Sequence, residues 1–297
     1  MRLLRVATFL DPVRYADGLR LLEGLAAARA AGVVPDTVLV LEVGKRNWSA
    51  AQPAVQSCFL FLLFTPFLSL SHPTPSHQHH PVYTLGRRGL ETHLRGVSAG
   101  KPDEKEAFAA ATGADISASP RGGEATWHGP GQAVVYPVLA LRPLNLGARA
   151  YVDALEDAMI AAAARWGVRA EARVGGRGPG AWVGPRKIGA VGVRISRGVA
   201  SHGIAFNACP DLTAYDAIIP CGEDVGRGGA RPVTSLDEEL RQGVFGCSAA
   251  VGGPLVTADE AGAALVAALA SRVGWEAVES VDAGLVWAEA EAALKGK

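Results

Sequence analysis

The chain has 297 residues, of which 49% are hydrophobic and 20% charged, so it is long and apolar enough to bury a globular core. Lysine plus arginine number 29, as do aspartate plus glutamate, which gives a formal net charge of zero. The sequence therefore lacks the basic excess of a phosphate-binding surface, and we expect no nucleic-acid partner.

The first predicted elements are a helix and a strand. Apolar residues recur at helical spacing from Tyr15 to Ala31, and Gly32 ends the run. Residues Thr37 to Glu42 then form a short apolar run that is typical of a buried strand.

Residues 43–78 differ in composition from the chain on either side. An apolar run from Phe59 to Leu70 contains Pro66 and is well short of the roughly 20 residues that cross a bilayer, so no membrane segment is expected. The codons for Phe, Leu, Ser and Pro are rich in pyrimidines, and Gly44-Lys45 and Gln78 can be encoded by splice-site sequences. We interpret the stretch as an intron translated in frame, with a genuine disordered or surface insertion as the alternative.

With that stretch set aside, residues 1–42 and 79–297 are predicted to form a single domain. The four cysteines are scattered without a CxxC pair, which indicates neither a zinc site nor a disulfide scaffold and is typical of a reducing compartment. Four histidines crowd together, and a metal-binding tract is the alternative interpretation, but we expect no metal site. These residues are Cys58, Cys209, Cys221 and Cys247, and His72, His77, His79 and His80.

The later elements alternate between strands and helices. Gln132 to Leu139 is predicted as a strand, and Tyr151 to Trp166 as an amphipathic helix. Ala190 to Ile195 and Val199 to Asn207 are expected to pair as a β-hairpin. A capping box starts a further helix that runs from Thr257 to Gly274. Because no steady βαβ rhythm appears, we expect the α+β class.

Five strings occur in order along the chain: VYTLGRR at 82–88, RGGEATWHGPGQ at 121–132, RKIGAVGVRI at 186–195, HGIAFN through IIPCG at 202–222, and VTSL at 233–236. Together they resemble the octanoyltransferase family, which makes protein-bound lipoate. Apart from the foreign stretch, the resemblance covers the chain from about Tyr15 to Leu240. It implies mixed β-sheets with flanking helices, as in the catalytic domain of biotin and lipoate protein ligases.

Cys221 is the candidate nucleophile. A lone cysteine is more often a small buried hydrophobe, but this one lies between Pro220 and Gly222, in a loop-like setting that suits an accessible thiol. Transfer of an acyl group between two bulky carriers benefits from a covalent relay. A free thiol has a pKa near about 8.5 and needs a cationic neighbour to become a thiolate at neutral pH.

Lys187 is the candidate cationic neighbour. From its position alone, before an apolar run, a solvated surface lysine is the simpler interpretation. The resemblance implies otherwise, because in the family the lysine of the K-I-x-x-x-G string pairs with the cysteine of PCG. The separation, 221 − 187 = 34 residues, agrees with the family spacing. By that resemblance, Lys187 lowers the pKa of Cys221 and acts as general acid and base.

The glycine-rich string is the candidate acyl-binding segment. Glycines allow the chain to bend sharply and to approach a ligand closely, although two ordinary turns are the alternative. The resemblance implies that this string and two later segments contact substrate, with Trp127 where the family usually has Tyr or Phe. The implied substrate-binding residues are Arg121, Gly122, Gly123, Glu124, Ala125, Thr126, Trp127, His128, Ala190, Val191, Gly192, Gly203, Ile204 and Ala205.

Two histidines and a basic pair have open roles. His128 and His202 each lie beside a glycine in a matched string, which suits hydrogen bonding near an acyl carbonyl, while a structural role is equally open for His202. Arg87 and Arg88 are either the solvated end of a loop or a docking contact for acidic carrier proteins.

The resemblance implies an enzyme that transfers an octanoyl group from acyl carrier protein to a lysine, with Cys221 carrying the acyl group as a thioester. The implied acceptors are the lipoyl domains of 2-oxoacid dehydrogenases and the glycine-cleavage H protein. Passing from thioester to amide is downhill, so neither ATP, metal nor another cofactor is expected. We expect a monomer.

Two other functions stay open. An ATP-dependent lipoate or biotin protein ligase shares the expected fold but needs no nucleophilic cysteine, so the PCG string argues against it. A non-catalytic binder of lipoyl domains is the second alternative, and the retained Cys221 and Lys187 argue against that.

The expected location is the mitochondrion, or the cytoplasm if the source is bacterial. An intron implies a eukaryote, in which lipoylation is mainly mitochondrial. Arg2 and Arg5 precede the first acid, Asp11, but this segment is short for a transit peptide.

Overall fold

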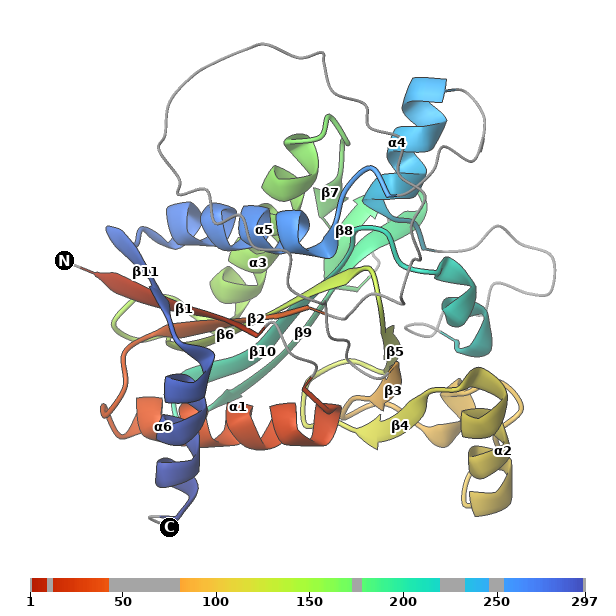
Figure 1. The fold of residues 1–297 in the computed structure, drawn as a ribbon, viewed down its shortest axis with the longest axis horizontal. Coiled ribbons are helices and arrows are strands. Elements are labelled where there is room, and N and C mark those ends of the chain that lie inside the picture. The colour runs from red at the N-terminus through yellow and green to blue at the C-terminus, as the bar shows by residue number, and fades with distance from the viewer. Residues whose placement is uncertain are drawn as a thin grey trace.

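The centre of the fold is an eight-stranded mixed sheet in the order β11-β1-β2-β6-β10-β9-β8-β7 (Figure 1). The computed structural model describes residues 2–9, 13–42, 81–172, 178–219, 233–245 and 254–295. Strand β1 pairs in parallel with β2 and β11, whereas the other ladders of this sheet are antiparallel. The strands are β1 (Leu3–Phe9), β2 (Thr37–Glu42), β6 (Gln132–Ala140), β7 (Glu171–Ala172), β8 (Gly180–Val183), β9 (Arg186–Ser196), β10 (Val199–Asn207) and β11 (Ala277–Val281).

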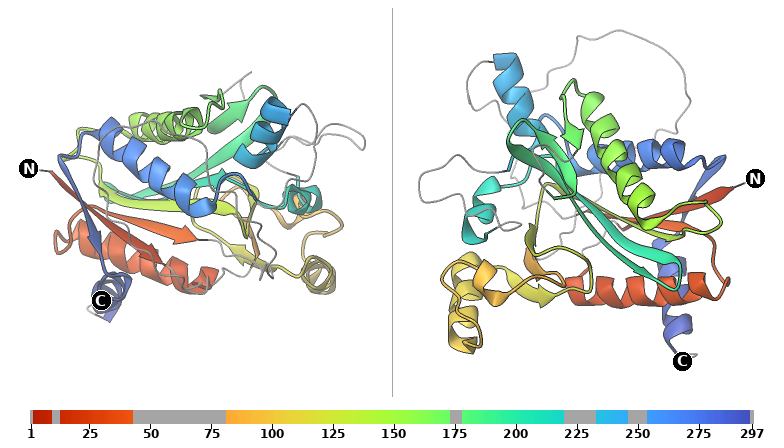
Figure 2. Two further views of the ribbon diagram at one scale, coloured as in Figure 1. Left: turned by 45° about the horizontal axis from the view of Figure 1, so that its top comes forward. Right: turned by 180° about the vertical axis from the view of Figure 1, so that it is seen from behind.

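Helices cover both faces of this sheet (Figure 2). One face carries α1 (Tyr15–Ala30) and α6 (Ala283–Lys295), and the other carries α3 (Ala148–Ala164) and α5 (Ala258–Val273). A strand between two helical layers must be apolar on both sides, which explains why the run in β6 is almost continuously buried.

A second, three-stranded sheet stands beside the first, in the order β4-β3-β5. Its apolar side chains pack with those of the neighbouring helical segments into a separate core, in which Tyr83 and Trp127 meet Phe108 and Tyr215 edge to face. Its elements and neighbours are β3 (Val82–Leu85), η1 (Glu91–His93), α2 (Pro102–Thr112), β4 (Asp115–Ala118), β5 (Ala125–His128) and η3 (Leu212–Ala217). The remaining helix, α4 (Leu236–Phe245), packs against the core of the large sheet, where its Glu239 pairs with Arg186 of β9.

The helix and strand predictions agree closely with the structure. The helix from Tyr15 ends at Ala30, and Gly32 adopts φ +74°, as expected of a glycine that ends a helix. The strand at Thr37–Glu42 is confirmed as β2. The capping box of α5 forms, because Thr257 and Glu260 exchange hydrogen bonds.

The strand β1 was not anticipated, because the first residues were considered only as a transit segment. In the structure Leu4 and Ala7 are fully buried. Arg5 donates to both carboxylate oxygens of Glu289 in α6, at 3.1 and 2.9 Å. Residues Leu3–Phe9 are therefore part of the folded domain.

Several predictions fall outside the described residues. These are the foreign stretch 43–78 with Cys58, the four crowded histidines, and the candidate nucleophile Cys221. In the part of the chain that the structure describes, no three side chains of the metal-binding types cluster together. Across the same residues, no helix is long and apolar enough to cross a membrane.

Candidate active site

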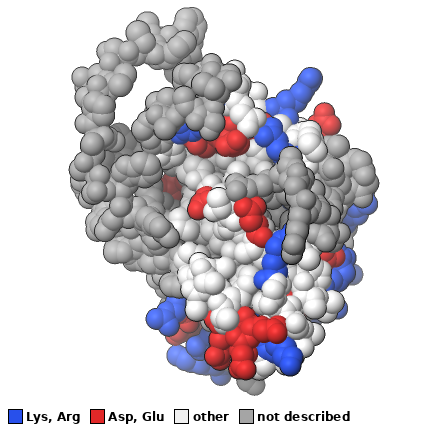
Figure 3. Space-filling view, turned by 90° about the vertical axis from the view of Figure 1, so that its right-hand side faces the viewer, with Lys and Arg blue, Asp and Glu red and all other residues white. Residues whose placement is uncertain are grey.

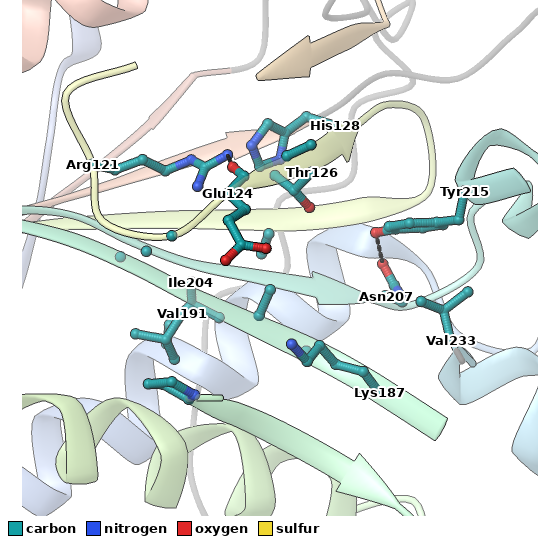
Figure 4. Close-up of a pocket in the computed structure, with 18 of the residues that line it drawn as sticks. Arg121, Glu124, Thr126, His128, Lys187, Val191, Ile204, Asn207, Tyr215 and Val233 are labelled. Carbon is teal, nitrogen blue, oxygen red and sulfur yellow. Dashed lines mark hydrogen bonds between the residues drawn. The ribbon is translucent and has the colours of Figure 1, made fainter. Parts of the chain in front are cut away.

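A cleft of about 750 Å³, counting the part open to solvent, lies between the two sheets (Figure 4). One wall comes from β5 and the loop before it, and the other from β9 and β10. The lining residues are Arg121, Gly123, Glu124, Ala125, Thr126, His128, Tyr136, Pro179, Lys187, Gly189, Ala190, Val191, Gly192, Gly203, Ile204, Ala205, Asn207, Tyr215 and Val233. The wall is mainly apolar with a few polar groups, as expected for a site that takes an aliphatic ligand.

Lys187 places a cationic group in this largely apolar cleft. The residue is 9% exposed and lies near the start of β9, where it pairs with Trp182 of β8. Its Nζ lies 4.6 Å from the centroid of the Trp182 ring, within the range of a cation–π interaction. Its backbone oxygen accepts a hydrogen bond from Thr234 N at 2.9 Å. These contacts fix the ammonium group in the wall of the cleft.

Arg121 organises the glycine-rich loop from within. Its guanidinium donates to the carbonyl oxygens of Thr84, Gly122 and Glu124, at 2.9 to 3.1 Å, and to the Thr84 hydroxyl at 2.7 Å. Gly123 adopts φ +92°, a conformation that residues with a Cβ rarely reach. The loop therefore owes its shape to one buried cation and one left-handed glycine.

A polar network closes one end of the cleft. His128 Nδ1 lies 2.8 Å from Gln132 Oε1, and Gln132 Nε2 donates to Asn207 Oδ1 at 3.0 Å and to the Tyr215 hydroxyl at 2.9 Å. Asn207 Nδ2 in turn donates to Thr234 O at 2.9 Å. Because the members are buried, these bonds offset the cost of removing polar groups from water.

Glu124 brings a carboxylate to the wall opposite Lys187 (Figure 4). Its Oε2 is buried and accepts no hydrogen bond within the residues described. The nearest basic side chains lie at longer range, with His93 Nε2 at 3.6 Å from Oε2 and Arg88 Nε at 3.9 Å from Oε1.

The structure brings most of the predicted site residues together. Lys187 and twelve of the fourteen implied substrate-binding residues line the cleft, and the exceptions are Gly122 and Trp127. Gly122 instead donates from its backbone nitrogen to Val193 O at 2.9 Å, and Trp127 packs in the core of the small sheet. His202 lies on a separate depression with Arg194.

Sequence reasoning did not single out several lining residues, among them Tyr136, Asn207 and Tyr215. Tyr136 and Asn207 lie in strands that were predicted, but nothing in a strand pattern says which face meets a cleft. Tyr215 lies in η3, inside the string at 202–222 but between its two named parts, HGIAFN and IIPCG, so this position was the available signal.

Comparison with known proteins identifies similar chains. The family of the lipoyl protein ligase A/B catalytic domain matches residues 76–249. The mitochondrial octanoyltransferase LIP2 of Arabidopsis thaliana is 37% identical over 231 residues, which are 77% of this chain and 77% of that protein. The octanoyltransferase of Solibacter usitatus is 36% identical over 230 residues, 76% of this chain and 80% of that protein.

Solved structures confirm the expected fold. Lipoate-protein ligase A bound with ATP superposes with a TM-score of 0.60 at 10% identity, over 98% of this chain and 93% of that one. The bi-partite lipoate protein ligase of Thermoplasma acidophilum gives 0.54 at 12% identity, over 99% and 90%. At such identities the likeness concerns the fold alone.

Proposed function

The chain belongs to the octanoyltransferases of the lipoyl protein ligase A/B family, and from this premise we propose that it carries the octanoyl group on Cys221, as a thioester, between an acyl carrier protein and an acceptor lysine. It is an acyltransferase of protein lipoylation. The proposal depends above all on the ammonium of Lys187, which is held in the wall of a mainly apolar cleft.

Cys221 lies outside the described residues, but the short stretch of chain that joins it to Ile219 supports its assignment as the nucleophile. Ile219, two residues earlier, donates from its backbone nitrogen to His93 O at 2.8 Å, and His93 is a neighbour of the cleft carboxylate Glu124. Two residues span at most about 7 Å. The chain resumes at Val233, which lines the cleft and bridges to Lys187. Both ends of the intervening segment are thus anchored beside the cleft.

In the first half-reaction the Cys221 thiolate attacks the octanoyl thioester of the donor and releases the donor thiol. Lys187, as a cation, favours the thiolate over the thiol and then exchanges protons with the reacting groups. In the second, an acceptor amine attacks the acyl-enzyme, an amide forms and the thiol is regenerated. We propose lipoyl domains and the glycine-cleavage H protein as acceptors and a monomeric enzyme in the mitochondrion.

Docking of the donor is assigned to the exposed pair Arg87 and Arg88. Arg88 is the partner of Glu124 at the cleft, and its side chain is 74% exposed. Acidic side chains gather instead over α2, from Asp103, Glu104 and Glu106 (Figure 3). An acidic carrier protein is repelled by α2 and attracted by the arginine pair, so charge favours an approach beside Glu124.

Intact mass spectrometry after mixing with octanoyl-acyl carrier protein tests the proposed function. We expect an octanoyl adduct that hydroxylamine removes and that Cys221→Ala abolishes, whereas the control Cys209→Ala retains it. Octanoyl transfer that survives Cys221→Ser contradicts the covalent route and favours a ligase-type reaction.

Replacing Trp182 tests whether its ring holds the ammonium. Trp182→Phe and Trp182→Leu both remove buried volume, but only phenylalanine keeps a π face beside Lys187. We expect acyl-enzyme to form about 2- to 30-fold more slowly in the leucine variant than in the phenylalanine variant, because a cation–π contact is worth about 0.5–2 kcal/mol. Mass spectrometry of samples quenched at successive times measures the two rates. Equal rates at equal thermal stability contradict the role of the Trp182 ring in holding the ammonium.

A further inference from the structure

Glu124 has a rigid main chain and a side chain with spare acceptor capacity. Its backbone oxygen accepts from Gly86 N at 3.0 Å and from Arg121 Nη2 at 3.1 Å, which fixes the residue in the wall of the cleft. Its carboxylate accepts no hydrogen bond among the described residues, and Oε2 is buried. Figure 4 shows this carboxylate directed toward the strands that carry Lys187, Val191 and Ile204.

The basic side chains near Glu124 do not use up that capacity to accept hydrogen bonds. His93 Nε2 and Arg88 Nε lie at 3.6 and 3.9 Å, beyond hydrogen-bonding distance, and the Arg88 side chain is mostly exposed. Arg121 is directed to the carbonyl oxygens of its own loop and to Thr84. A carboxylate in a mainly apolar cleft that lacks a close donor is suited to a cationic group of the substrate.

The second half-reaction brings such a group. A lysine side chain has a pKa near about 10.4, so at neutral pH fewer than about one in a thousand is the free amine that can attack a thioester. Lys187 is already a cation when it stabilises the thiolate. Two ammonium groups in one cleft repel each other, and the incoming one needs both a counter-charge and a proton acceptor.

We propose that Glu124 binds the ε-ammonium of the acceptor lysine and removes its proton, an inference that rests on the proposed function. The proton passes from the ammonium nitrogen to the Glu124 carboxylate. The freed lone pair forms the N–C bond to the thioester carbonyl carbon, and the C–S bond breaks with its electron pair on sulfur. The new amide nitrogen loses a second proton to that sulfur, and Glu124 releases the first to solvent.

Two acceptors of different basicity separate this role from a structural one. Glu124→Gln keeps the shape of the side chain but removes its charge. With a lipoyl domain as acceptor, we expect discharge of the acyl-enzyme to slow by about 10²-fold, the typical contribution of a general base. Hydroxylamine is uncharged at neutral pH, so its reaction with the same acyl-enzyme should change less than twofold. The control Glu106→Gln, on the exposed face of α2, should match wild type in both reactions.

The possible failures are distinguishable. If the wild-type protein forms no acyl-enzyme, the proposed function itself fails. If wild type transfers to the lipoyl domain and Glu124→Gln does so at the same rate, only the role of Glu124 is overturned. If Glu124→Gln slows discharge of the acyl-enzyme equally toward lysine and toward hydroxylamine, the role of Glu124 is also overturned, because a distorted cleft affects both acceptors. Partial recovery in Glu124→Asp supports the role of the charge.

Discussion

Replacing Lys187 with methionine is expected to slow acyl-enzyme formation by about 10²- to 10⁴-fold, the range that general acid–base groups contribute. Methionine is of similar length and suits a buried position next to Trp182, so the fold should persist. Losing the ammonium removes both the charge that favours the thiolate and the group that exchanges protons. Both half-reactions should therefore suffer.

The two contributions of Lys187 can be measured separately. Alkylation of Cys221 at neutral pH, followed by peptide mass spectrometry, reports the thiolate fraction, and it should fall in Lys187→Met. Lys187→Arg keeps a charge but cannot give up a proton at neutral pH, so it should alkylate faster than the methionine variant and still transfer poorly. The control Lys105→Met removes a half-buried lysine of α2 that pairs with Glu91. Wild-type rates in Lys187→Met contradict the proposed dyad.

Helices whose apolar spacing and end signals lie within one segment were predictable from the sequence. The helix α1 carries its apolar spacing and its terminating glycine within one segment, and α5 carries its own capping box. By contrast, β1 forms only because β2 and β11 lie beside it, and β11 comes from the other end of the chain. Pairing over such a separation leaves no signature in seven residues.

In the candidate site, too, features with a local sequence signal were predictable and features that depend on distant segments were not. The recognised strings supplied most of the cleft wall, since three of them contain β5 with the loop before it and most of β9 and β10. The chemistry of Glu124 was not readable, because its unsatisfied carboxylate depends on where His93 and Arg88 fall in space. Likewise, alternation along β5 puts Trp127 and Thr126 on opposite faces, but the sequence does not say that the face of Thr126 meets the cleft and that Trp127 packs in a core.

The buried His202 is expected to make the fold sensitive to mild acid. It is 3% exposed, and its Nδ1 has no hydrogen-bond partner within the described part of the chain. Burial, aided by the cations Arg121 and Arg194, lowers the pKa of His202 to about 4. An unfolded histidine has a pKa of about 6.5. Between these values the unfolded chain binds a proton that the folded chain excludes, so the free energy of unfolding falls as pH falls. The free energy of unfolding should fall by about 2 kcal/mol from about pH 7.5 to 5, and by about 3 kcal/mol by pH 4.

Urea unfolding of wild type and His202→Asn across this pH range measures the effect. Asparagine is the matched replacement because residue 202 adopts φ +58°, a left-handed conformation that asparagine tolerates better than most residues. That conformation falls where the ladder between β10 and β6 is interrupted, between the pairs Ala200–Leu139 and Ile204–Val135. The facing stretch of β6 contains Pro137, which has no N–H to donate. His202→Asn should lower stability at neutral pH and lose much less between pH 7.5 and 5. All other ionisable groups are common to the two proteins, so the difference between the two curves isolates the histidine. Parallel curves would mean that His202 can take up its proton in the folded state, through the depression it shares with Arg194.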